Sequence, residues 1–159
     1  MTGSAHWRRG MKALHEIAAL GVGGGLVCCL VIGMTANAAS PAEFAVSRKA
    51  IAAIANYVLL PSMALVLISG LLSIAATRGF HDAGWAWLKL FLGISVFEAT
   101  LLTIGASSRL AEFTAANVDP DSLASMLSSE RKTLWILIGL SVANVALAVW
   151  RPRLLIKIR

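Results

Sequence analysis

Four long apolar runs, joined by more polar segments, dominate the pattern of the chain. They cover about residues 11–36, 50–77, 84–106 and 133–150. Each reaches or approaches the ~20 residues that an α-helix needs to cross ~30 Å of hydrocarbon. Only isolated polar residues interrupt the runs, whereas a helix of a soluble bundle carries a polar stripe. The pattern predicts an all-α, membrane four-helix bundle that forms one transmembrane domain over residues 1–159.

The lengths of the connections predict how the helices are arranged in space. Residues 37–49 and 78–83 are short links, so we expect consecutive helices to be antiparallel neighbours in an up-down topology. The third link, 107–132, is longer and contains Asp119-Pro120-Asp121-Ser122, where Asp121 or Ser122 is the expected helix cap. We expect the following LASMLSSERK to form a short amphipathic helix at the membrane surface, with RLAEFTAAN as a second candidate.

The first run has an alternative interpretation as a secretory signal peptide. Basic residues precede it, and Ala36-Asn37-Ala38 fits a small-x-small cleavage pattern. Its apolar stretch is longer than the ~7–15 residues of a typical signal. We therefore expect it to remain as a membrane span.

Composition and charge agree with a membrane location. Hydrophobic residues make up 58% of the chain and charged residues 14%, against roughly 25% charged in an average soluble domain. The net charge of +6 does not predict nucleic-acid binding, because the basic residues flank the apolar runs, where they contact lipid headgroups.

The distribution of Lys and Arg predicts the orientation. The two tails and the second link carry eight of these residues, and the first and third links carry five. The positive-inside rule therefore places both termini in the cytoplasm. A compact four-span chain with short loops suits a bacterial inner (cytoplasmic) membrane.

Four ionisable residues lie inside the predicted spans, where a charge is costly unless it is paired or hydrated: His15, Glu16, Lys89 and Glu98. His15 lies ~6 Å inside the first helix and Lys89 ~7 Å inside the third. Both helices enter from the same side, so these two residues share a depth. Alternatively, Lys89 extends to the headgroups beside Trp85 and Trp87, and His15 and Glu16 mark a hydrated helix end.

Glu98 lies deeper, ~12 Å from the far end of its helix and about 180° around it from Lys89. Asn56 and Tyr57 have a comparable depth and are candidate hydrogen-bond partners. The other possibilities are a protonated Glu98 or contact with a second subunit.

Small residues predict where the helices pack closely. Gly21 and Gly25 form a Gly-x-x-x-Gly notch, and further glycines that allow close approach are Gly70, Gly93, Gly105 and Gly139. Pro61 removes one backbone hydrogen bond and is expected to kink the second helix. The adjacent Cys28 and Cys29 point about 100° apart on a helix, so we expect small hydrophobic residues there rather than a disulfide.

Several kinds of site are missing from the sequence. It contains no glycine-rich phosphate loop, His-Glu-x-x-His zinc motif or nucleophile triad. His6, His15 and His81 are the only histidines, which excludes the two bis-histidine haems of a cytochrome b561 type. One haem with His15 as a ligand remains compatible with the sequence.

These residues resemble a known superfamily. Lys12-Ala-Leu-His15 with the following glycine stretch, Pro61 with Ser69-Gly70, and Gly84-Trp85-x-Trp87-Leu88-Lys89-Leu90 are similar to the four-helix CopD-like membrane proteins. The layout also resembles HemJ-type protoporphyrinogen IX oxidases. That resemblance implies that His15 binds haem b and that Lys89 is essential for a membrane oxidoreductase activity.

The chain departs from the HemJ type after the first glycines. It reads CCLVIGMTA where HemJ-type proteins continue into an aromatic stretch that ends in Leu-Pro-Arg. It is more similar to the uncharacterised predicted integral membrane proteins of the superfamily, for which the resemblance implies no settled activity.

The leading hypothesis is a haem-b-binding membrane protein in haem, porphyrin or electron handling. His15 is the expected axial metal ligand, Lys89 a second ligand or the partner of a haem propionate, and Glu16 a group that orients His15 or local water. One alternative is a cofactor-free accessory or scaffold subunit of a larger complex or homo-oligomer. Another is a permease for copper or a small solute, with Glu98, Asn56 and Asn144 as polar sites. Copper ranks lower, because Met34, Met63, Cys28 and Cys29 have no recognisable spacing.

Overall fold

The computed structural model describes the backbone of residues 3–37, 40–76, 83–114 and 119–150, and almost all of these residues are helical. The all-α prediction is confirmed. The helices are α1 (Gly3–Thr35), α2 (Pro41–Ile54), η1 (Ala55–Leu59), α3 (Leu60–Ala76), α5 (Gly84–Thr114) and α6 (Pro120–Trp150).

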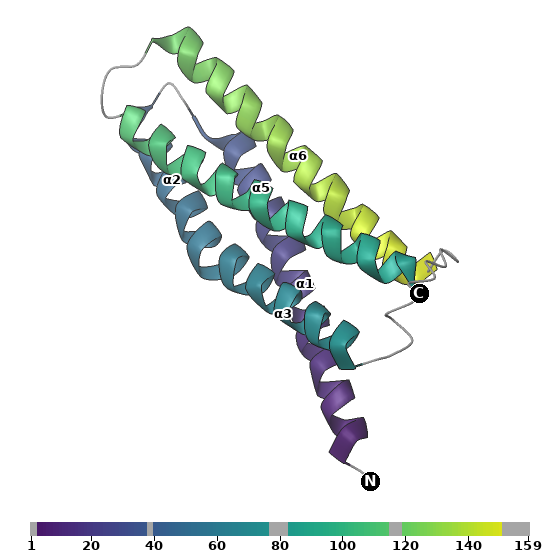
Figure 1. Cartoon of the computed structure of the whole chain (residues 1–159). Helices are drawn as coiled ribbons and strands as arrows, with labels where there is room; N and C mark the ends of the chain where they lie inside the picture. Colours follow the sequence, from purple (N-terminus) through teal and green to yellow (C-terminus); the bar gives the residue numbers. More distant parts are fainter. Residues whose placement is uncertain (1–2, 38–39, 77–82, 115–118, 151–159) are drawn as a thin grey trace.

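Four long rods make up the molecule, because α2, η1 and α3 follow one another without a break (Figure 1). Each rod contains a segment long and apolar enough to cross a membrane. Figure 1 shows the N-terminal part of α1 extending beyond the other helices, while α5 and α6 lie side by side. The predicted set of four membrane-spanning segments is therefore present.

The helices are longer than the apolar runs. α2 begins at Pro41, inside the segment expected to be a link, because proline suits the first turn of a helix. The prediction of a separate surface helix after Ser122 was wrong, since this stretch belongs to α6. The predicted cap was also displaced: the Asp119 carboxylate accepts a hydrogen bond from the Ser122 backbone N–H at 3.2 Å. The second candidate stretch continues α5 as far as Thr114.

The helices share a small apolar core and present most of their apolar surface outward. Only 11–33% of the most apolar window of each span is buried. Large apolar side chains are exposed on all four rods, for example Leu20, Ile68, Leu102 and Val149. A soluble protein does not expose apolar surface on this scale, whereas lipid is a good solvent for it. The core residues are Val22, Leu26, Cys29, Leu30, Ile51, Ala55, Leu59, Met63, Val96, Leu134 and Leu137.

At the predicted glycine notch on α1, two helices approach closely. A Cβ atom at Gly21 would collide with the Ser62 hydroxyl, and one at Gly25 would lie 2.6 Å from Leu59 Cδ2. In contrast, a Cβ at Gly24 or Gly139 would meet no atom within 4 Å in the described part of the chain. The prediction of close packing is thus confirmed at Gly21 and Gly25. At Gly139 the described part of the chain shows no close packing.

The notch makes a direct prediction about stability. Gly25→Leu is expected to lower the free energy of unfolding by about 1–3 kcal/mol, because the added side chain must displace Leu59. Gly24→Leu adds the same side chain one residue away, where space is open, and is expected to leave stability nearly unchanged. Thermal unfolding of both variants in one detergent measures the difference. Equal melting temperatures for the two variants would contradict the close packing at Gly25.

The effect of Pro61 appears as a π-helical turn rather than only as a missing bond. Pro61 has no backbone N–H, and the turn immediately before it, η1, has π geometry, with the Leu60 N–H bonded to the Ala55 carbonyl. A π turn adds a residue to the helical repeat and rotates the next part of the helix about its axis. Asn56, Tyr57 and Val58 of this turn are exposed, and Ala55 and Leu59 on either side of them are buried.

Candidate functional site

His15 is fixed by a hydrogen bond between two helices. Its Nδ1 atom lies 2.7 Å from the hydroxyl oxygen of Ser69, which is buried in α3. His15 itself is half-buried on α1. The imidazole also lies over Gly70, where an added Cβ would be 3.9 Å from its Cε1 atom. The Ser69-Gly70 pair therefore provides one polar contact and an open surface for the ring.

The partners of Ser69 decide which nitrogen of His15 carries the proton. The Ser69 hydroxyl donates its single hydrogen to the Leu65 carbonyl oxygen at 2.5 Å. It can then only accept from His15, so Nδ1 carries the hydrogen and donates it to Ser69. Neutral imidazole leaves Nε2 with a free lone pair in this tautomer. A histidine whose Nδ1–H is held in this way is the usual form of a metal ligand.

Lys89 lies near this site, as the shared depth of the two residues predicts. It is half-buried on α5, and its charge is close enough to act on the His15 ring. The side chains of Trp85 and Trp87 are half-buried on the same turns of α5. Lys89, Trp85 and Trp87 all make further interactions. The structure thus brings a histidine and a lysine from two separate rods to one end of the bundle.

Glu16 has a different position from His15. Its side chain is 65% exposed and forms an ion pair with Lys12 at 3.6 Å, one helical turn away. The group that hydrogen-bonds His15 is Ser69, which stood out in the sequence only as part of a motif. The sequence shows a single serine in an apolar run, but it does not show that this serine contacts a residue of another helix. A role of Glu16 in ordering water stays a prediction.

The donor set at His15 fits a haem iron, but the interior of the bundle does not fit the macrocycle. The two best-formed pockets in the described part of the chain have room for little more than one water molecule each. Leu14, the neighbour of His15 in the sequence, is exposed on the surface of α1. A flat apolar group bound through His15 would therefore lie against the outer surface of the bundle.

The polar residues considered for a permease are not brought together. Asn144 is half-buried on α6 facing Gly93, and its Oδ1 atom has no hydrogen-bond partner among the described residues. Glu98 and Asn56 are instead exposed, and the Asn56 amide donates to the Ala52 carbonyl at 2.9 Å. The hydrogen bond expected between Glu98 and Asn56 or Tyr57 of the same chain is absent from the described contacts.

The soft ligands considered for copper are also separate. Cys29 and Met63 are buried in the core, whereas Cys28 and Met34 are exposed. Both cysteines are free. Within the ranges that the structure describes, no three His, Cys, Asp or Glu side chains gather in a metal-binding cluster.

A buried ion pair lies near the opposite end of α1. The Arg48 guanidinium donates from Nη1 to Glu130 Oε2 at 2.5 Å, and the two side chains are 1% and 10% exposed. Arg48 also stacks on Phe44, with its Cζ 5.1 Å from the ring centroid. The sequence pattern places both charged residues in the connections between spans. They are 82 positions apart, so no local pattern could have paired them.

No protein-family model matches this chain, and the comparisons with curated proteins and with solved structures found no match either. The assignment of a function therefore rests on the residues and on the geometry of the bundle.

Proposed function

We propose that this chain is a haem-b-binding protein of a bacterial inner membrane that works in haem, porphyrin or electron handling. The observation that carries the proposal is the hydrogen bond of His15 Nδ1 to Ser69, which leaves Nε2 free to bind a metal. The resemblance of the sequence to HemJ-type and CopD-like proteins agrees with the same residue.

His15 would hold the iron, and Lys89 would either provide a second ligand or pair with a propionate. Haem supplies one-electron redox chemistry where it binds. The protein's own contribution is to orient the imidazole through Ser69, to leave room for the imidazole ring over Gly70, and to provide the positive charge of Lys89.

The proposal includes an antiparallel bundle with both termini in the cytoplasm, which places His15 and Lys89 near the cytoplasmic face. The excess of Lys and Arg on that side supports it. The buried Arg48 is paired with Glu130 and does not act as a loop charge. Removing Arg48 from the count of five changes the balance from eight against five to eight against four.

The visible spectrum of the detergent-purified chain, oxidised and then reduced with dithionite, tests the proposal. We expect a Soret band, with sharp α and β bands on reduction, either directly or after haem is added. A spectrum without these bands, even after addition of haem, would contradict the proposal. It would leave the accessory-subunit and permease hypotheses, which co-purification and transport assays would separate.

Ser69→Ala should weaken haem binding without removing the ligand. Loss of the hydroxyl leaves His15 free to rotate and to exchange its proton between the two nitrogens, so we expect about 10- to 100-fold lower haem affinity. Titration of the apoprotein with haem, followed at the Soret band, measures the change. Ser73→Ala is the matched control, because Ser73 bonds only to the Ser69 carbonyl, one turn further along α3. Equal affinities in the two variants would contradict the positioning role of Ser69.

A further inference from the structure

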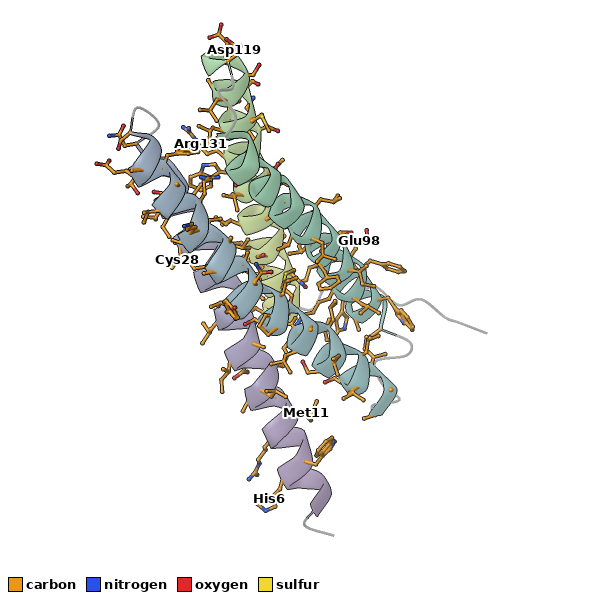
Figure 2. The ribbon with its side chains drawn as sticks, turned by 90° about the vertical axis from the view of Figure 1, so that its left-hand side faces the viewer. His6, Met11, Cys28, Glu98, Asp119 and Arg131 are labelled. Carbon is orange, nitrogen blue, oxygen red and sulfur yellow. The ribbon has the colours of Figure 1, made fainter. Side chains whose placement is uncertain are left out.

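Glu98 presents an ionisable group to the lipid-facing side of the bundle. Its side chain is exposed on the outer edge of α5 (Figure 2). It forms no hydrogen bond or ion pair with the part of the chain that the structure describes. At 1.5 Å per residue it lies about 21 Å along the helix from Gly84, well inside a hydrocarbon core of ~30 Å. A carboxyl group in that position needs a partner, because lipid provides none.

The neighbouring rod carries exposed hydrogen-bond donors at the same level. Ala55 and Leu59 of η1 line one pocket together with Thr100 of α5, so η1 lies beside the turn that contains Glu98. Tyr57, which lies between Ala55 and Leu59, has 82% of its surface exposed. The adjacent Asn56 is also exposed, and its amide has donor and acceptor capacity beyond the bond to Ala52.

These donors point outward because the residues on either side of them face the core. Ala55 and Leu59 are buried and four positions apart, so they share one face of the helix. Asn56, Tyr57 and Val58 lie between them and are all exposed. The chain therefore has donors on η1 and an acceptor on α5, on adjoining rods, that do not bond to one another.

We propose that the α5–η1 face is an interface between two copies of this chain, in which Glu98 of each copy accepts hydrogen bonds from Tyr57 and Asn56 of the other. Donors and acceptor are exposed on adjoining rods, so a two-fold axis that brings these rods of two copies together would satisfy both sets with the same contact. Interhelical hydrogen bonds of this kind stabilise association in lipid. The exposed side chains of Phe91 and Leu102 flank Glu98 on α5 and would provide the surrounding apolar contact. The proposal is independent of haem binding.

The test measures self-association of the full-length chain in phosphatidylcholine vesicles at increasing dilution in lipid. Energy transfer between copies labelled at Ser125→Cys, in a Cys28→Ser background, reports the association; Ser125 is exposed near the start of α6, and Cys29 is buried. We expect the labelled chain without substitutions at the proposed interface to form dimers. Glu98→Leu and Tyr57→Phe are each expected to raise the dissociation constant about 10- to 100-fold, because a two-fold contact loses each interaction twice.

Two further variants make the result specific. Glu98→Gln keeps an acceptor oxygen at this position and should retain most of the association. Glu43→Gln removes an exposed carboxylate at the start of α2, far from the proposed interface, and should leave association unchanged. Removing the outward-facing side chain of Glu98 does not disturb the core, so the variants should fold. A monomeric parent chain, or a dimer that is equally stable with Glu98→Leu, would overturn the proposal.

Discussion

His15→Ala is expected to abolish the Soret band of the purified, haem-supplemented protein. The substitution removes the imidazole proposed as the axial ligand, and the Ser69 hydroxyl cannot replace it. The side chain is half-buried at one end of the bundle and outside the core cluster, so the helical content should be retained. The absorption spectrum, normalised to protein concentration, together with far-ultraviolet circular dichroism, measures both quantities.

His6→Ala is the matched control for that experiment. His6 lies on the same helix and is exposed near its start (Figure 2). We expect its loss to leave the spectrum unchanged. If His15→Ala kept the full band, or if His6→Ala lost it, the assignment of His15 as the axial ligand would be wrong.

Arg48→Leu is expected to destabilise the fold by about 3–5 kcal/mol, because it breaks a nearly buried ion pair by removing one of its members. The arginine joins α2 to α6 and lies 1% exposed against Phe44, close to Gly33. Thermal or denaturant-induced unfolding in detergent measures the loss. Lys49→Leu, which removes the neighbouring but exposed cation, should change stability little.

The double variant Arg48→Leu/Glu130→Leu separates the net contribution of the ion pair to stability from the loss of stability when only one of its members is removed. Arg48 Nε and Nη2 find no hydrogen-bond partner in the described part of the chain, so the pair compensates only part of the desolvation of the guanidinium. We therefore expect the double variant to recover most of the lost stability. A double variant that is no more stable than Arg48→Leu alone would contradict this expectation.

Much of the architecture was predictable because membrane spans are recognisable by length and composition. The apolar runs predicted four spanning helices, and the described part of the chain contains four helices long and apolar enough to span a membrane. The shared depth of His15 and Lys89 also followed from counting crossings, and Lys89 lies close enough to His15 for the two groups to interact electrostatically. The notch at Gly21 and Gly25 was readable because only small residues let two helices approach closely.

The partners of the polar residues were not predictable in the same way. A soluble helix shows its inner face by the period of its apolar residues, whereas these helices are apolar on all sides. The sequence therefore could not tell that Glu98 faces outward and Asn144 inward. It also could not show that the turn before Pro61 is a π turn, or that Tyr57 faces away from the bundle.

The sequence by itself determined the number of spans, their polar residues and the depth of each, since these depend only on position along a helix. The tertiary structure alone decided how each helix is rotated, and with it the contacts of His15 with Ser69 and of Arg48 with Glu130. The members of these pairs are 54 and 82 residues apart. In lipid, helix rotation depends on the packing of small residues and on a few polar contacts, and both involve pairs of helices rather than one.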